Sequence, residues 1–121
     1  MKIAVASLLL VLAAAPQVNV AGRWEGTLSA QRSDGTPVSE STLLILEQKE
    51  KTITGSVGRD ESDRHPITSG TIDGTKVVLA VKNARNDREY RVELTVDGDE
   101  MKGTIATGGQ TAQIEVKRRK A

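Results

Sequence analysis

The sequence predicts an all-β protein whose strands form an eight-stranded antiparallel up-and-down barrel. Three observations lead to this prediction. No segment after Ala21 spaces its apolar residues with a helical period, whereas apolar and polar residues alternate in eight short runs. Turn sequences rich in Gly, Asp and Asn separate most of these runs. Four runs also contain a glycine, a hydroxyl residue and an aliphatic residue in succession, starting at Gly26, Gly55, Gly70 and Gly103.

These glycines favour a closed sheet. The glycine and the aliphatic residue are two positions apart, so they lie on the same face of a strand. Glycine weakens a strand unless the sheet bends there or another backbone comes close. Repeated around a sheet, it allows strongly coiled strands to close into a barrel.

The first residues are predicted to be a signal peptide. Lys2 is followed by an uncharged apolar run at 3–15, which is too short to span a bilayer and has the length of a signal-peptide core. We assign residues 1–21 to the signal peptide and 22–121 to a single β-barrel domain. An uncleaved membrane anchor is the alternative.

The cleavage position is left open between residues 15 and 21. Cleavage after Ala15 follows a small-residue pattern, but Pro16 is a poor residue after the cut. Cleavage after Ala21 places Asn19 at a position that normally holds a small residue.

Composition excludes several classes of function. The 17 basic and 16 acidic residues balance once Lys2 is removed, which argues against a nucleic-acid binder. The absence of cysteine excludes disulfides, thiol catalysis, a thiolate metal site and a lipid anchor. Trp24 and Tyr90 are the only aromatic residues, too few for a stacking surface.

The first four predicted strands alternate, with turn residues between them. In chain order they are 23–31, ended by Ser-Asp-Gly-Thr-Pro at 33–37; 42–48, ended by the Lys-Glu-Lys turn at 49–51; 52–58, followed by a polar loop at 59–65; and 66–73. Asp73-Gly74 is a strong signal for a two-residue hairpin.

The last four predicted strands follow the same rule. They are 76–83, ended by Arg-Asn-Asp at 85–87; 88–96, the most regular alternation; 100–107, after the Asp97-Gly98 turn; and 110–119, after Gly108-Gly109.

All the connections are short, so neighbouring strands must pair antiparallel as a meander. Such a meander closes most simply into a barrel, while a β-sandwich is the alternative and usually needs longer connections. The residues expected to line the interior are aliphatic: Leu28, Leu44, Leu46, Ile53, Val57, Ile72, Leu79, Val92, Leu94, Ile105, Ile114 and Val116.

Two predicted strands are apolar on both faces, which places Leu43, Ile45 and Val78 on the outside of the barrel. Apolar outer stripes are often interfaces. They therefore indicate either a subunit or partner interface, or a strand covered by a loop or by the N-terminal segment of the mature chain.

Gly22-Arg23-Trp24 at the start of the first strand resembles the Gly-x-Trp start of lipocalins and of avidin-like barrels, which are calycin-type folds. In those families the tryptophan packs near one end of the barrel, beneath a basic side chain of the last strand. The resemblance implies a structural clasp between Trp24 and Arg118. Thr54-Gly55-Ser56 and Ser69-Gly70-Thr71 are also similar to avidin-type strands.

Departures from those families limit what the resemblance implies for function. The second lipocalin motif, an acidic residue and a tyrosine in a turn, is absent. Biotin binding in avidin-like proteins depends on several tryptophans, and this chain has one. Biotin binding is therefore not expected.

No catalytic, cofactor or metal site is predicted. His65 is the only histidine and is expected in an exposed turn, without the partners of a catalytic triad. Its loop also holds Asp60, Glu61 and Asp63, but lacks the glycine-turned spacing of a calcium site. Two further clusters are assigned no site, namely Asp97, Asp99 and Glu100 in a hairpin turn and the basic tail at 117–120.

The expected function is that of a non-catalytic exported barrel, periplasmic or extracellular, with no cofactor and no membrane segment after cleavage. Its interior either holds a small apolar ligand or is packed solid. The alternative is an interaction or homo-oligomerising module that uses the outer apolar stripes of the second and fifth strands.

Overall fold

The computed structural model describes residues 18–32 and 34–119. These residues form strands joined by turns, and none of them forms a helix long and apolar enough to cross a membrane. The strands are β1 (Gly22–Gln31), β2 (Pro37–Lys49), β3 (Thr52–Asp60), β4 (Asp63–Asp73), β5 (Lys76–Lys82), β6 (Glu89–Asp97), β7 (Glu100–Thr107) and β8 (Gln110–Arg119).

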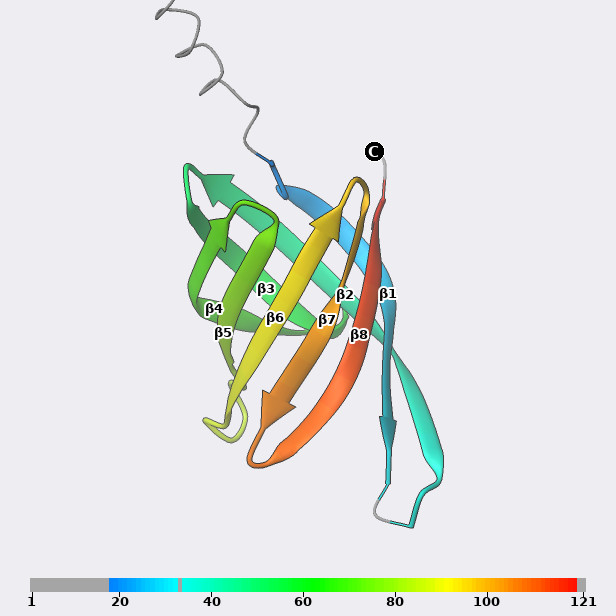
Figure 1. Cartoon of the computed structure of the whole chain (residues 1–121). Helices are drawn as coiled ribbons and strands as arrows, with labels where there is room; N and C mark the ends of the chain where they lie inside the picture. Colours follow the sequence, from blue (N-terminus) through cyan, green and yellow to red (C-terminus); the bar gives the residue numbers. More distant parts are fainter. Residues whose placement is uncertain (1–17, 33, 120–121) are drawn as a thin grey trace, which may run out of the picture.

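The strands close into one barrel in sequence order, and every neighbouring pair is antiparallel (Figure 1). Closure comes from β1, which pairs with β2 on one side and with β8 on the other, Trp24 lying opposite Arg118. The predicted up-and-down meander barrel is therefore confirmed, and the sandwich alternative is wrong. Loop length decided between them, because two-residue turns allow only neighbouring strands to pair.

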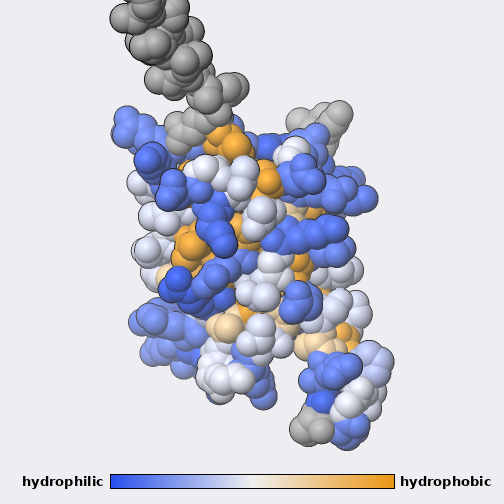
Figure 2. All heavy atoms as spheres, in the orientation of Figure 1, coloured by the Kyte–Doolittle hydropathy of each residue, from blue (hydrophilic) through white to orange (hydrophobic). Residues whose placement is uncertain are grey.

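The core is the aliphatic interior that alternation predicted. Ten of the twelve expected interior residues are buried, and the other two, Leu28 and Ile105, are partly buried against the same cluster. The face of the molecule seen in Figure 2 is largely hydrophilic, with small apolar areas between the polar side chains. Leu28 and Ile105 lie near the C-terminal ends of β1 and β7, and both line the same pocket.

The repeated glycines lie where neighbouring strands approach too closely for a side chain. A Cβ at Gly26 would lie 1.8 Å from the carbonyl oxygen of Glu115, and one at Gly103 would lie 1.7 Å from that of Glu93. A Cβ at Gly55 would lie 1.9 Å from the carbonyl oxygen of Ile45, and one at Gly70 would lie 2.6 Å from that of Ile53. The glycines thus permit the tight coiling that closes the barrel.

Two hairpin loops start at the glycine of an Asp-Gly pair, one residue later than the sequence suggested. Asp73 and Asp97 are the last residues of their strands, and the two-residue loops start at Gly74 and Gly98, which have positive φ angles of 65° and 64°. A glycine at the first loop position is a recognised hairpin arrangement. Strand order is unaffected.

Two predicted boundaries were wrong. β2 begins at Pro37, not at 42, so that the ends of β1 and β2 form an arm that projects past the neighbouring strands (lower right of Figure 1). An arm outside the core needs no apolar face, so alternation did not reveal it. The expected loop at 59–65 is a tight hairpin in which Asp60 pairs with Asp63.

Candidate ligand pocket at the open end of the barrel

One end of the barrel is sealed by Trp24 and the residues that precede the first strand. The Trp24 side chain is fully buried, and its indole N–H donates to the carbonyl oxygen of Val20, 2.9 Å away. The Arg118 guanidinium carbon lies 4.5 Å from the centroid of the indole ring, and Arg118 Nε donates to Asp99 Oδ1. The structure therefore brings together the two residues of the expected clasp.

Residues 18–21 lie across this end as a plug. Gln48 accepts from the Val20 backbone N–H and donates to the Val18 carbonyl, at 2.8 and 3.0 Å. Arg118 donates from its two terminal nitrogens to the carbonyls of Ala21 and Asn19, at 2.7 and 2.8 Å. Val20 is fully buried. Val20 and Trp24 thus fill this end of the core.

The opposite end is hollow. A pocket of about 270 Å³ opens there, and its inner wall is apolar. The residues of this wall are Leu28, Val57, Val81, Tyr90 and Ile105. The interior is therefore packed with side chains around Trp24 and hollow at the opposite end. Its volume lies just below the usual range of small-molecule sites, so it has room only for a small ligand.

A buried carboxylate with cationic neighbours forms part of the pocket rim. Arg59 Nε donates to Asp63 Oδ2 at 2.9 Å. Arg85 Nη2 and His65 Nε2 lie 3.2 and 3.3 Å from Asp63 Oδ1. The Arg59 hydrogen bond lowers the pKa of Asp63, assisted by the charges of Arg85, Arg59 and His65 and opposed by desolvation.

Asp63 Oδ1 is the one buried side-chain oxygen or nitrogen among the described residues that lacks a hydrogen bond. Arg85 Nη2 and His65 Nε2 lie within ion-pair distance of this atom, but neither has hydrogen-bond geometry toward it. A buried acceptor without a donor is uncommon in folded proteins. In this arrangement Asp63 Oδ1 thus lacks a hydrogen bond, and the exposed Arg85 side chain lies beside it.

His65 links the rim to the β5–β6 loop. Its Nδ1 accepts from the Ala84 backbone N–H at 3.4 Å, and in the neutral tautomer this places the ring proton on Nε2, toward Asp63. The imidazole therefore has protein neighbours at both nitrogens. Among the described residues, no group of three His, Asp or Glu side chains is arranged to hold a metal ion.

The sequence did not place these two residues correctly. His65 was expected in an exposed turn, and Asp63 in the same polar loop. In the structure, Asp63 and His65 lie on β4 and line the pocket, and their side chains are 13% and 16% exposed. The sequence did contain a signal for this placement: Asp63, His65 and Ile67 are two positions apart, so they share one face of a strand. The signal was obscured because two of these inward residues are polar.

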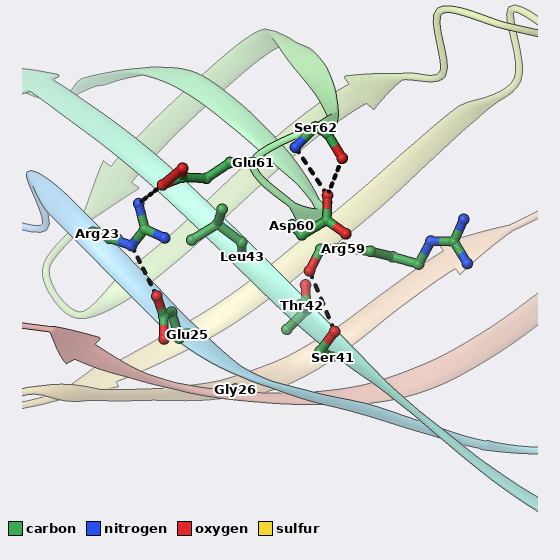
Figure 3. Close-up of a pocket in the computed structure, with 10 residues that line it drawn as sticks. All are labelled: Arg23, Glu25, Gly26, Ser41, Thr42, Leu43, Arg59, Asp60, Glu61 and Ser62. Atoms are coloured by element: carbon green, nitrogen blue, oxygen red, sulfur yellow. Dashed lines mark hydrogen bonds and ion pairs between the residues drawn. The ribbon is translucent and has the colours of Figure 1, made fainter.

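A second hollow lies outside the barrel, between β1, β2 and the β3–β4 turn (Figure 3). Arg23 forms ion pairs with Glu25 and with Glu61 of that turn, and Leu43 of β2 lies beside Arg23 and Glu61 in the view of Figure 3. Leu43 is only 3% exposed. The outward leucine is therefore covered by the chain itself, the loop-covering alternative in the sequence analysis.

The other two outer apolar residues are half-buried and do not adjoin each other. Ile45 lies on β2 and Val78 on β5, with β3 and β4 between them. The residues opposite them on β3 and β4 are uncharged: Ser56 pairs with Ile45, and Thr71 pairs with Val78. The three residues proposed for an interface therefore form no single exposed patch.

The remaining charged clusters are ion pairs of the closed end. Asp99 binds Arg118, and Glu100 lies 4.0 Å from Lys117. Asp97 is the last residue of β6, directly before the turn that contains Asp99. The basic tail extends to Lys120, which is outside the described residues.

No protein-family model matches the sequence, and no curated protein matches it. Two solved structures are similar in fold. One is a SAHS (abundant heat soluble) protein from Ramazzottius varieornatus, with 16% identity, a TM-score of 0.48 and coverage of 83% of this chain and 95% of that chain. The other is a point variant of the fluorescent protein UnaG, with 14% identity, a TM-score of 0.48 and coverage of 84% and 97%.

Neither similarity assigns a ligand or an activity to this chain. The architecture rests instead on the strand order, closure and register described above. The chain is an eight-stranded closed antiparallel meander barrel in which Arg118 lies over Trp24.

Proposed function

We propose that the protein is an exported, non-catalytic binding barrel that takes a small ligand in the pocket opposite Trp24. The observation that carries this proposal is the combination of an apolar wall and an unsatisfied carboxylate oxygen in one 270 Å³ pocket. Binding sites for small molecules typically combine an apolar lining with a few placed polar groups.

The rim indicates the chemistry of the ligand. Asp63 is negatively charged near neutral pH, and its Oδ1 can only accept a hydrogen bond. The arginines beside it already neutralise this charge. The ligand we propose is therefore an apolar molecule with a hydrogen-bond donor at one end, such as an alcohol or an amide, with its body against Leu28 and Ile105.

A binding role is favoured over catalysis by the arrangement of His65. Both of its ring nitrogens face groups of the protein, namely Asp63 and the Ala84 N–H. A histidine that activates a nucleophile needs one nitrogen directed at that nucleophile. The proposed role of His65 is to position Asp63 and the β5–β6 loop.

Export rests on the sequence of the first residues, of which 1–17 lie outside the described part of the chain. Support comes from the basic residue at position 2 and the short apolar run that follows it. We propose a periplasmic or extracellular location. A chain without cysteine requires no oxidising compartment to fold but tolerates one.

The first test identifies the natural ligand. Protein purified from the compartment to which it is exported is analysed by native mass spectrometry and then by extraction into organic solvent. We expect a co-purifying small molecule with a hydroxyl or amide group. A ligand-free protein that also gains no thermal stability from added 1-octanol would contradict the proposal.

The second test compares 1-octanol with octanoate, which have the same chain length but differ in the head group. We expect octanol to bind at least about tenfold more tightly, because its hydroxyl can donate a hydrogen bond to Asp63 Oδ1, whereas the carboxylate of octanoate has no proton to donate. Asp63→Asn should reduce this preference. Equal binding of the two probes would disprove the assignment of a donor head group.

The outer surface supplies an alternative function, a protein-interaction or oligomerising module. It is now supported by Ile45 and Val78 and by the uncharged side chains on the strands between them, since interface centres contain few charges. Leu43 cannot contribute while the β3–β4 turn covers it. Sedimentation of the wild type and of Ile45→Lys tests this alternative: a monomer in both cases removes it.

A further inference from the structure

We infer that proteolytic maturation removes the leader on the N-terminal side of Val18, within the alanine run at 13–15, and that residues 18–21 belong to the mature barrel. This inference rests on the proposed export of the protein. The sequence alone leaves two cleavage positions open, after Ala15 and after Ala21. The structure distinguishes them, because the second would remove the plug.

The plug is an integral part of the packed core. The Val20 side chain has no solvent exposure and belongs to the same cluster as Trp24, while Val18 packs against that cluster. Cleavage after Ala21 would expose this end of the core to water. Burying an aliphatic side chain of this size stabilises a fold substantially, so its loss is costly.

The plug also satisfies a buried polar group of the barrel. The indole N–H of Trp24 is a donor only, and its acceptor is the carbonyl of Val20. Without the plug this buried donor would lose its acceptor, which is expensive. The hydrogen bond of the Trp24 indole therefore requires the residues on the N-terminal side of the first strand.

Two side chains from distant strands hold the plug by its backbone. Gln48 of β2 contacts both the N–H of Val20 and the carbonyl of Val18. Arg118 of β8 spans the carbonyls of Asn19 and Ala21. Four backbone groups of four consecutive residues are thus recognised by side chains. A segment discarded during maturation would have no need of such contacts.

The sequence provides small residues at the required place. Ala13, Ala14 and Ala15 end the apolar run and lie at least two residues before Val18. Signal peptides end in small residues of this kind. Cleavage of a peptide bond in this run, by hydrolysis with water, leaves a short N-terminal extension ahead of the intact plug.

The decisive experiment determines the N-terminus of the exported protein. The full chain, with its own first 21 residues, is produced in a Gram-negative bacterial host, and the protein of the periplasmic fraction is analysed by intact mass and N-terminal sequencing. We expect a chain that starts at residue 14, 15 or 16. A chain that starts at Gly22 would overturn the inference while leaving export supported.

Retention of the uncleaved chain in the cytoplasm or membrane would overturn both this inference and the proposed export. The two failures are therefore distinguishable, because the first gives a shortened chain in the periplasm and the second does not.

A second measurement tests the plug independently of processing. Chains that begin at Pro16 and at Gly22 are compared by urea unfolding and by the fluorescence of Trp24, the only tryptophan. We expect the shorter chain to unfold at lower urea and its emission to shift to the red. If it does not fold, Val20→Ser in the longer chain should give the same shift.

The matched control for this substitution is Asn19→Ser, because Asn19 is an exposed residue of the same segment. It should leave the emission unchanged. Identical unfolding midpoints and emission for the chains starting at Pro16 and Gly22 would show that the plug is dispensable and would overturn the inference.

Discussion

Single residues decide which end of this barrel is closed. Arg118 lies over the Trp24 indole, binds Asp99 and holds two carbonyls of the plug, although it belongs to a strand at the other end of the chain. Its long side chain buries its stem and guanidinium against the ring while remaining 24% exposed. Arg118 therefore belongs to the strand that closes the barrel and also holds the plug that seals one end.

Replacing this residue should destabilise the protein. For Arg118→Gln we expect a loss of about 1–3 kcal/mol in the free energy of unfolding, since a cation–π contact and charge-assisted hydrogen bonds disappear together. Urea unfolding followed by Trp24 fluorescence measures the loss. The control is the neighbouring Arg119→Gln, which removes an exposed ion pair and should cost less than about 0.5 kcal/mol. Equal effects would contradict the clasp.

Asp63 should make stability depend on pH in the acid range. Its pKa is lowered in the folded protein, chiefly by the hydrogen bond from Arg59. The resulting stabilisation is complete above the ordinary aspartate pKa of about 3.9 and is lost as the pH falls through the lowered folded value. We expect Asp63→Asn to be less stable than the wild type near pH 7, with the difference shrinking below about pH 4.

Chemical denaturation at a series of pH values measures this difference. Asp97→Asn, in a turn at the opposite end of the barrel, is the control and should track the wild type. A difference for Asp63→Asn that stays constant from neutral to acid pH would show that the carboxylate charge is not involved.

At the scale of elements, the strands owe their coiling to glycines. Gly103→Ala would bring a methyl group within 1.7 Å of the Glu93 carbonyl oxygen of β6. Backbone cannot move aside cheaply, so we expect a loss of at least about 3 kcal/mol, at the upper end of overpacking effects. Thermal unfolding by circular dichroism measures it.

The matched control is Gly108→Asn in the β7–β8 loop. Gly108 has a φ of 51°, a Cβ added there would have nothing within 4 Å, and asparagine is favoured at this place in a two-residue hairpin. Its effect should stay within about 0.5 kcal/mol. A tolerant Gly103 would indicate that strand coiling does not depend on these glycines.

The β3–β4 hairpin should behave as part of the packed structure because it covers Leu43. Leu43→Ala is expected to cost about 2–4 kcal/mol, as for a core leucine. Ile45→Ala, two residues along the same outer face and half-buried, should cost about 1 kcal/mol. Similar small losses at both positions, measured by urea unfolding, would mean that the hairpin does not cover Leu43 in solution.

The sequence predicted these elements well where strands bury one face. The alternation at 88–96 located β6 to within one residue, and strand order followed from loop length. It failed at Pro37–Lys49, whose first residues lie in the projecting arm, and at Asp63–Asp73, whose first inward positions are polar. Both failures have one cause: an apolar pattern reports burial, and neither segment buries apolar side chains there.

The candidate site was hidden for the same reason. The clasp of Trp24 and Arg118 was found through family resemblance and register. The pocket rim was missed, because inward-facing Asp63 and His65 look like turn residues in a polar stretch. Polar residues at inward positions are a local departure from the folding pattern, and such departures are expected at functional sites.

On the scale of the whole molecule, the barrel has two different ends. The plug and the packed aliphatic core occupy the end with Trp24, while the pocket and its charged rim occupy the other. The plug, which follows the inferred processing site in the sequence, lies on the closed side, away from the pocket. Maturation is therefore expected to complete the closed end without altering the ligand pocket.

This asymmetry can be measured directly by methyl NMR during titration with 1-octanol. The account predicts chemical-shift changes at the pocket methyl groups of Leu28, Val57, Val81 and Ile105, with none at Leu46 and Ile72 in the packed core. Changes centred on Leu46 and Ile72, or no changes at any methyl group at saturating octanol, would contradict a barrel that is closed at Trp24 and binds at its far end.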